Sequence, residues 1–137
     1  MASNQIEAQD ALLSQIATVW AANANGAPIY YDNQDADRPD VPQMFGRAIM
    51  RHESGTRTTL GINRFRRFGS VFVQLFVPQG TGTVLIRELS DAIAHNLEES
   101  PTSLGIRIRD VDIHELGSDG TYFQVNVSAA FSYDRQA

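Results

Sequence analysis

Apolar residues recur at helical spacing in two segments of the chain. In residues 4–22 the apolar stripe consists of Ile6, Leu13, Ile16 and Trp20, and Leu12 and Val19 widen it. It predicts an amphipathic helix, and Gly26, a residue suited to a left-handed position, predicts where that helix ends. In residues 83–99 the apolar side chains fall at steps of four, at Leu85, Leu89, Ile93 and Leu97. This stripe predicts a second helix, which Pro101 stops.

Alternation of apolar and polar residues predicts the strands. Residues 28–32 and 44–53 are short candidates, and residues 65–77 form a longer one. One face of the long segment carries Val71, Val73, Leu75 and Val77, and the other carries Phe72 and Phe76. Apolar residues on both faces predict a central strand, or a strand whose second face meets another subunit. Residues 54–63, rich in Gly and Thr, predict a long hairpin tip.

The last third of the chain predicts an antiparallel pair of strands. Ile106 and Ile108 alternate with polar residues before Val111 takes up the opposite parity, which predicts a bulge near Arg109. Residues 117–120 predict a turn. After the turn the apolar positions alternate without a break, at Phe123, Val125, Val127, Ala129, Phe131 and Tyr133. This pattern is typical of a strand with one buried face.

The order of these elements is helix, strands, helix, strands. It predicts a single α+β domain over residues 1–137, with a mainly antiparallel sheet of four to five strands and two helices packed on one face. The valine-rich face of residues 71–77 is expected to pack under the stripe of the second helix. Residues 33–43, with two prolines and no periodicity, predict a long loop.

Composition limits the chemistry that the chain can carry. It has 16 Asp and Glu residues against 11 arginines, no lysine and no cysteine, and its net charge is −5. Neither a disulfide nor a thiolate zinc site is therefore possible. We expect no secretory signal and no membrane span. Arginine is favoured at packed protein interfaces, although genomic base composition would give the same bias.

No motif predicts a catalytic centre, a metal or a cofactor. The acidic segment around Asp35, Asp37 and Asp40 lacks the glycine and glutamate of a calcium loop, so we interpret it as a solvated or partner-facing loop. Gly80, Thr81, Gly82 and Thr83 precede a helix without the lysine of a nucleotide loop, which favours a plain turn. The three histidines are far apart. We therefore expect no enzyme, no metal and no cofactor.

Arginine and phenylalanine interleave at Arg64, Phe65, Arg66, Arg67 and Phe68. Such a cluster can hold single-stranded nucleic acid through backbone charge and base stacking. It can equally pair with an acidic surface of a neighbouring subunit. Since the rest of the chain is acidic, we favour contact with protein, and nucleic-acid binding remains the alternative.

This cluster also opens an ordered set of motifs. Residues 29–33 (IYYDN) and an acidic loop with prolines come first, then the cluster with Gly69, then residues 73–78 (VQLFVP) and 80–83 (GTGT). In this order the set resembles the tail terminator-like family of long-tailed phages. The match covers residues 28–99, about half of the chain, and the acidic loop is longer than the family pattern.

The resemblance implies a structural protein without catalytic residues or cofactors. Proteins of this family form a ring, typically a hexamer, at the head-proximal end of the tail tube. The ring stops tube growth and presents the surface that joins the head. The implied partners are other copies of the chain, the tail tube protein and the head–tail connector. DNA would pass through the lumen without specific binding, and the protein would belong to the virion after assembly in the host cytoplasm.

We expect the contacts with the tube or the next subunit to come from the cluster and two loops. The candidate interface residues are Arg64, Phe65, Arg66, Arg67, Phe68, Asp35, Asp37, Asp40 and Arg57. Both loops, residues 33–43 and 54–63, are poor in large apolar groups, so we expect them to order only in the assembly. Replacing Arg64, Arg66 and Arg67 should weaken assembly and leave the isolated fold intact.

Overall fold

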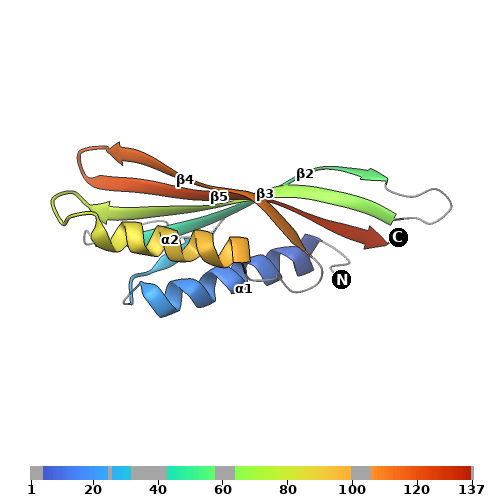
Figure 1. The fold of residues 1–137 in the computed structure, drawn as a ribbon, viewed down its shortest axis with the longest axis horizontal. Coiled ribbons are helices and arrows are strands. Elements are labelled where there is room, and N and C mark those ends of the chain that lie inside the picture. Colours follow the sequence, from blue (N-terminus) through green and yellow to red (C-terminus); the bar gives the residue numbers. More distant parts are fainter. Residues whose placement is uncertain (1–4, 25, 32–42, 58–63, 100–105, 137) are drawn as a thin grey trace.

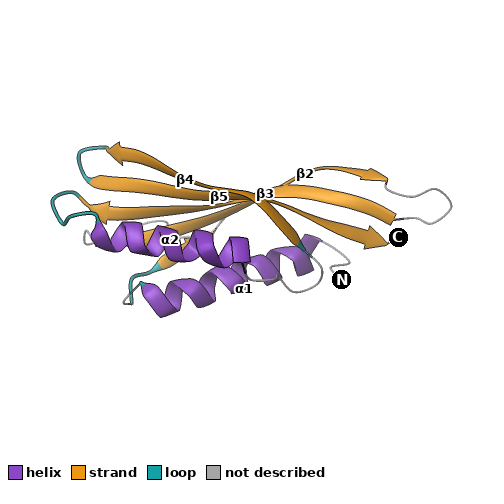
Figure 2. Cartoon of the chain, in the orientation of Figure 1, coloured by secondary structure: helices purple, strands orange, loops and turns teal. Residues whose placement is uncertain are grey.

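A computed structural model describes residues 5–24, 26–31, 43–57, 64–99 and 106–136. Two helices, α1 (Gln5–Asn23) and α2 (Val84–Glu99), lie on the same side of a five-stranded sheet (Figure 1). The strands are β1 (Ile29–Tyr31), β2 (Phe45–Arg57), β3 (Arg64–Pro78), β4 (Arg107–Ser118) and β5 (Tyr122–Gln136). The predicted α+β class, with both helices on one face, is confirmed (Figure 2).

The order of strands across the sheet is β1-β2-β3-β5-β4, so β3 is central, as its two apolar faces predicted. Only β1 runs parallel to its neighbour β2; the other three pairings are antiparallel. In Figure 1, β2, β3 and β5 extend past the end of α2. The central position gives β3 a partner strand along its whole length on the β5 side.

The core lies between β3, β5 and α2. Val71, Val73 and Leu75 are fully buried against Leu89 and the rest of the α2 stripe. The predicted packing is confirmed with one shift, because Leu85 is only half-buried and Ile86 is fully buried instead. Alternate residues of β5 complete the core, at Val125, Val127 and Ala129.

Helix α1 packs beside α2 and on β2. The Gln15 side chain donates a hydrogen bond to Oδ1 of Asn96 on α2, at 2.7 Å. Near the end of α1 the Trp20 ring covers Gly46, where an added Cβ would lie 2.5 Å from the ring. The predicted stripe is wrong at its first position: Ile6 is 71% exposed. Ala8 and Leu12 face the core there, because they lie on the helix face that meets Phe131 and Tyr133 of β5.

The predicted hairpin tip at residues 54–63 is wrong over its first four residues. Strand β2 continues to Arg57, and Gly55 pairs with Arg67 after a register shift that follows His52. A bulge inserts an extra residue without ending the ladder, so glycine here marks an irregular strand rather than a turn. Residues 58–63, and the predicted loop at residues 33–42, lie outside the described residues.

The bulge in the last strand pair is confirmed. The register of β4 against β5 shifts between Arg109 and Asp112, and Asp110 takes a positive φ of 53°. The turn that follows β4 is held by the Asp119 carboxylate, which accepts the backbone N–H groups of Thr121 and Tyr122 at 2.8 Å each. Because of the bulge, the face of β4 that carries odd-numbered residues up to Arg109 carries an even-numbered residue, Asp112, directly after it.

Candidate interaction surface

The face of the sheet opposite α1 and α2, here called the open face, is covered by no helix in the described part of the chain (Figure 2). Its residues on β3 alternate with the buried valines, and all of them are half-buried: Arg66, Phe68, Ser70, Phe72, Gln74 and Phe76. Three phenylalanines on an uncovered face are unusual, because apolar rings are normally buried by a second layer. The open face is therefore the first candidate for an interaction surface.

Aromatic packing fills one end of the open face. The rings of Phe45 and Phe76, which face each other on β2 and β3, stack with centroids 4.6 Å apart. Tyr122 meets Phe45 edge-on at 5.2 Å. Within this cluster Phe45 is fully buried and Tyr122 is 4% exposed. This end stabilises the sheet and leaves the other end available.

Two arginines lie over phenylalanine rings of the same face. The Arg47 guanidinium is 5.4 Å from the centroid of Phe76, and that of Arg109 is 5.7 Å from the centroid of Phe68. Cation–π contacts of this kind hold the long side chains flat against the sheet. The open face thus presents positive charge over its apolar rings.

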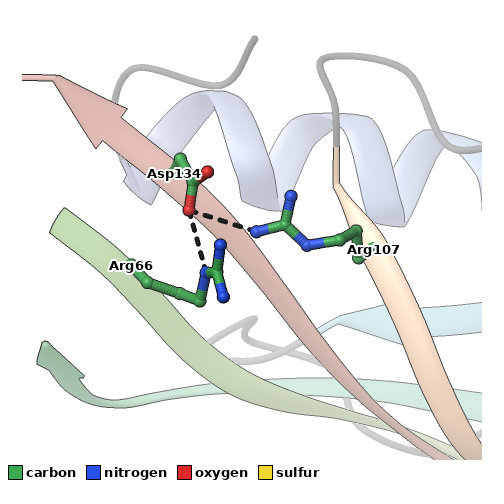
Figure 3. A network of polar contacts seen from close by, with 3 residues as sticks. All are labelled: Arg66, Arg107 and Asp134. Atoms are coloured by element: carbon green, nitrogen blue, oxygen red, sulfur yellow. Dashed lines mark hydrogen bonds and ion pairs between the residues drawn. The ribbon is translucent and has the colours of Figure 1, made fainter. Parts of the chain in front are cut away.

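A cluster of three ion-paired side chains lies where β3, β5 and β4 run side by side. Arg66 and Arg107 reach Oδ1 of Asp134 from the strands on either side, at 3.0 and 3.1 Å (Figure 3). The carboxylate side chain is 12% exposed, whereas the two arginines are 40% and 50% exposed. The hydrogen bond from Arg66, assisted by Arg107, lowers the pKa of Asp134 despite its burial. The arginines keep this carboxylate ionised.

The structure divides the predicted arginine cluster between the two faces. Arg66 and Phe68 lie on the open face, but Arg67 has the opposite parity and pairs in register with Tyr133, on the helix-covered side. Arg66 also forms an ion pair with Asp134, so its replacement would remove a contact within the molecule as well as a charge from the surface, and the expectation that the isolated fold stays intact remains a prediction. Arg57, Arg64 and Phe65 belong to strands, but their side chains are outside the description, and so are Asp35, Asp37 and Asp40.

Sequence reasoning missed the contribution of β4. Arg107 and Arg109 join Arg66 and Phe68 on the open face because β4 pairs with β5 beside β3. Arg107 and Arg109 are two residues apart in a predicted strand, so the sequence alone indicates that both lie on one face. Which strand lies next to which could not be read from the spacing.

Charge is distributed unequally between the two sides of the molecule. Outside the β4 bulge, the described side chains of the open face include five arginines and three carboxylates: Arg47, Arg51, Arg66, Arg107, Arg109, Glu53, Asp112 and Asp134. On the opposite side, the exposed surface of α2 carries four carboxylates and one arginine: Glu88, Asp91, Glu98, Glu99 and Arg87. Arg87 pairs with Glu115 of β4 at 2.8 Å. Among the described side chains outside the bulge, the open face therefore carries more positive than negative charge.

Among the described residues, no group of three or more His, Asp or Glu residues lies close enough to hold a metal ion. A cavity of about 540 Å³ beside the start of α2 is lined mainly by apolar groups such as Met44, Val77 and Val84. The Thr81 hydroxyl at its rim donates to the Pro78 carbonyl at 2.7 Å, so the Gly-Thr segment is a turn closed on itself, as interpreted. The cavity offers no nucleophile paired with a base.

No helix in the described part of the chain is long and apolar enough to span a membrane.

Comparison with known proteins gives a fold and no family. No protein-family model matches the chain, and no curated protein matches it. Among solved structures 28 chains match. One of them superimposes with a TM-score of 0.70 at 16% sequence identity, over 96% of this chain and 96% of its own length. The name of that protein describes no activity, so the likeness shows that the whole fold recurs elsewhere and says nothing about function.

Proposed function

We propose that this chain is a structural assembly protein of the tail terminator type. Its copies would form a ring, a hexamer as the resemblance implies, at the head-proximal end of a phage tail tube. The ring would stop polymerisation of the tube and present the surface that joins the head. The tail tube protein and the head–tail connector are the proposed partners, and the virion tail is the proposed location.

The observation that carries the proposal is the placement of the resembling motifs. Residues 64–69 and 73–78 lie on β3, at the centre of the sheet, and residues 80–83 connect β3 to α2. The motifs therefore form one continuous unit of strand, turn and helix start. Alternate residues of that unit lie on the open face, which combines apolar and positively charged side chains and which no helix of the described part of the chain covers. Such a surface favours binding to protein over chemistry.

The direct test combines native mass spectrometry with negative-stain imaging of the purified chain, alone and with preassembled phage tail tubes. The proposal expects rings, either free or at one end of each tube, and tubes that stop growing when the protein is added. Tubes of unchanged length, with no ring and no bound protein, would refute the proposed function.

A second candidate is a single-stranded nucleic-acid-binding module. The observation that favours it is the placement of Phe68, Phe72 and several arginines on one sheet face, where bases could stack and phosphates could pair. Against it, three carboxylates lie among the five arginines, and two of those arginines already neutralise Asp134. Binding to single-stranded DNA that weakens steeply with added salt would support this candidate.

A further inference from the structure

One cross-strand row of the open face has an arginine at each end and small residues at the two register positions between, of which Ser70 donates a hydrogen bond to Glu53. Arg51 of β2 pairs with Ser70 of β3, Ser70 pairs with Ala130 of β5, and Ala130 pairs with Arg109 of β4. We call Arg51, Ser70, Ala130 and Arg109 the arginine row. Both arginines are exposed, and the row spans three strand spacings of about 4.8 Å, or about 14 Å in all.

Larger groups border the arginine row on β3. Phe68 and Phe72, two residues to either side of Ser70 on the same face, are both half-buried. On β5 the corresponding neighbours of Ala130 are Ser128 and Ser132. Small residues at Ser70 and Ala130 let another backbone element approach closely between the two arginines.

The exposed surface of α2 is complementary to this row in charge and in length. Glu88, Asp91, His95 and Glu98 follow one another at steps of three and four residues, so they form one stripe along the helix. From Glu88 to Glu98 the helix rises about 15 Å, close to the length of the row. None of the carboxylates of this stripe is paired with an arginine among the described residues. The acidic stripe here means these four residues.

The end of α2 gives an independent reason to expect a cationic partner. Glu98 and Glu99 lie in the last turn of the helix, which has no basic residue. Negative charge at the C-terminal end of a helix is unfavourable, because the helix dipole is negative there. The sequence from residue 100 to residue 105 supplies no cation either. Unfavourable charge that no nearby cation offsets is typical of a surface that binds a partner.

We propose that the open face binds a second copy of this chain, whose α2 lies across the strands with its acidic stripe against the arginine row. That these contacts close into a ring rests on the proposed function. The two surfaces that meet are the open face of one copy and α2 of the next. The stripe and the row are on opposite sides of one molecule, so the contact is heterologous. Repeated contacts of that type form a ring when the rotation closes, and a filament when it does not.

One other occupant fits less well. Two open faces packed against each other would oppose arginines with arginines, which is unfavourable at an interface. Glu53 accepts a hydrogen bond from Ser70 at 3.3 Å, so any anionic partner must pair with Arg51 and Arg109 at the ends of the row. The acidic stripe of another copy has the sign, the spacing and the helical backbone that the row accommodates.

Charge reversal on each surface tests the contact. In one variant Arg51 and Arg109 are both replaced by Glu, and in the other Glu88 and Glu98 are both replaced by Arg. Each variant alone should raise the concentration for half-assembly at least about tenfold, because like charges would then face each other. An equimolar mixture of the two should restore assembly through contacts between unlike variants.

Two control variants separate the contact from general charge effects. Arg51→Lys with Arg109→Lys keeps the positive charge and should assemble nearly as the original chain does. Asp10→Arg changes an exposed carboxylate of α1 outside the stripe and should also assemble. Circular dichroism and the denaturation midpoint of every variant check that the fold is retained.

The outcomes distinguish the inference from the proposed function. Rings or tube-bound protein that persist in both reversed variants would overturn the contact named here and leave the proposed function standing. A wild-type chain that neither self-associates nor binds tubes would refute both. Salt-sensitive binding of single-stranded DNA that is lost in the Arg51→Glu and Arg109→Glu variant would overturn the contact and assign the open face to nucleic acid.

Discussion

The same strands form both faces of the sheet, but within the described part of the chain α1 and α2 cover only one of them. On the helix-covered face the β3 residues Val71, Val73 and Leu75 are fully buried. On the open face Phe68 and Phe72, which are larger apolar groups, remain half-buried. At these positions the helices make the difference, because burial needs a partner surface as well as an apolar residue. The open face therefore combines large apolar side chains with partial exposure to solvent.

The charges differ in the same way. Beneath the helices the described core contains no arginine, whereas the open face holds arginines over phenylalanine rings and around Asp134. Long arginine side chains cover apolar area with their stems while their charged ends stay in water. These arginine side chains keep the open face hydrated in the free chain, and their charged ends remain able to pair with acidic groups.

The largest effect is expected where the covered face meets α2. Leu89 is 1% exposed, so Leu89→Ala should lower the free energy of unfolding by about 2–5 kcal/mol. The matched control is Val84→Ala on the same helix, because Val84 is 72% exposed and should tolerate the change. Chemical denaturation measures both variants. A loss below about 1 kcal/mol for Leu89→Ala would mean that α2 does not close the core as described.

A smaller effect is expected at Gly69, where the covered face is closely packed. An added Cβ would lie 2.5 Å from the Arg51 carbonyl oxygen and would also overlap the Phe131 ring. Gly69→Ala should therefore cost about 1–3 kcal/mol through overpacking. Ser128→Ala, on the open face, should change the unfolding free energy little. Equal stability of the Gly69 variant and the original chain would contradict this packing.

The smallest effect, and the one that depends on pH, concerns the open face. At neutral pH, Asp134→Asn should cost up to about 1 kcal/mol, because both arginine partners are substantially exposed. The folded-state pKa of Asp134 lies below its usual value of 3.8. Its contribution is therefore fully present above pH 3.8 and is lost as the pH falls through the lowered pKa. Denaturation midpoints at pH 7 and at acidic pH below 3.8 measure the difference, which should shrink as the pH falls. A difference of the same size at both values would exclude an ionic origin.

The repeating patterns of the sequence predicted the elements and the covered core. Alternation in residues 71–77 and 123–133 identified the inward positions correctly, since one buried face imposes a strict period. The extension of β2 to Arg57 was missed because glycine and threonine are typical both of turns and of bulged strands. The exposure of Ile6 was missed because the stripe of α1 has two registers, and packing against Phe131 selects the one through Ala8 and Leu12.

The candidate surface was only partly predictable. Consecutive arginines in a strand alternate between faces, so the cluster at residues 64–68 could not act as one patch. Arg66 and Phe68 gain Arg107, Arg109 and Asp134 through strand pairings that connect distant parts of the sequence. Neighbouring strands are set by topology, which spacing within one segment does not encode.

The central claim is that one copy presents its α2 to the open face of the next, and the absence of cysteine from the chain allows a direct measurement. Two single-cysteine variants are prepared, Ser128→Cys beside the arginine row and His95→Cys within the acidic stripe, and a short bismaleimide is added to each alone and to their mixture. A crosslinked dimer is expected in the mixture, with little crosslinking in either variant alone. Crosslinking of the Ser128→Cys variant with itself to the same extent, or none in the mixture under assembling conditions, would contradict it.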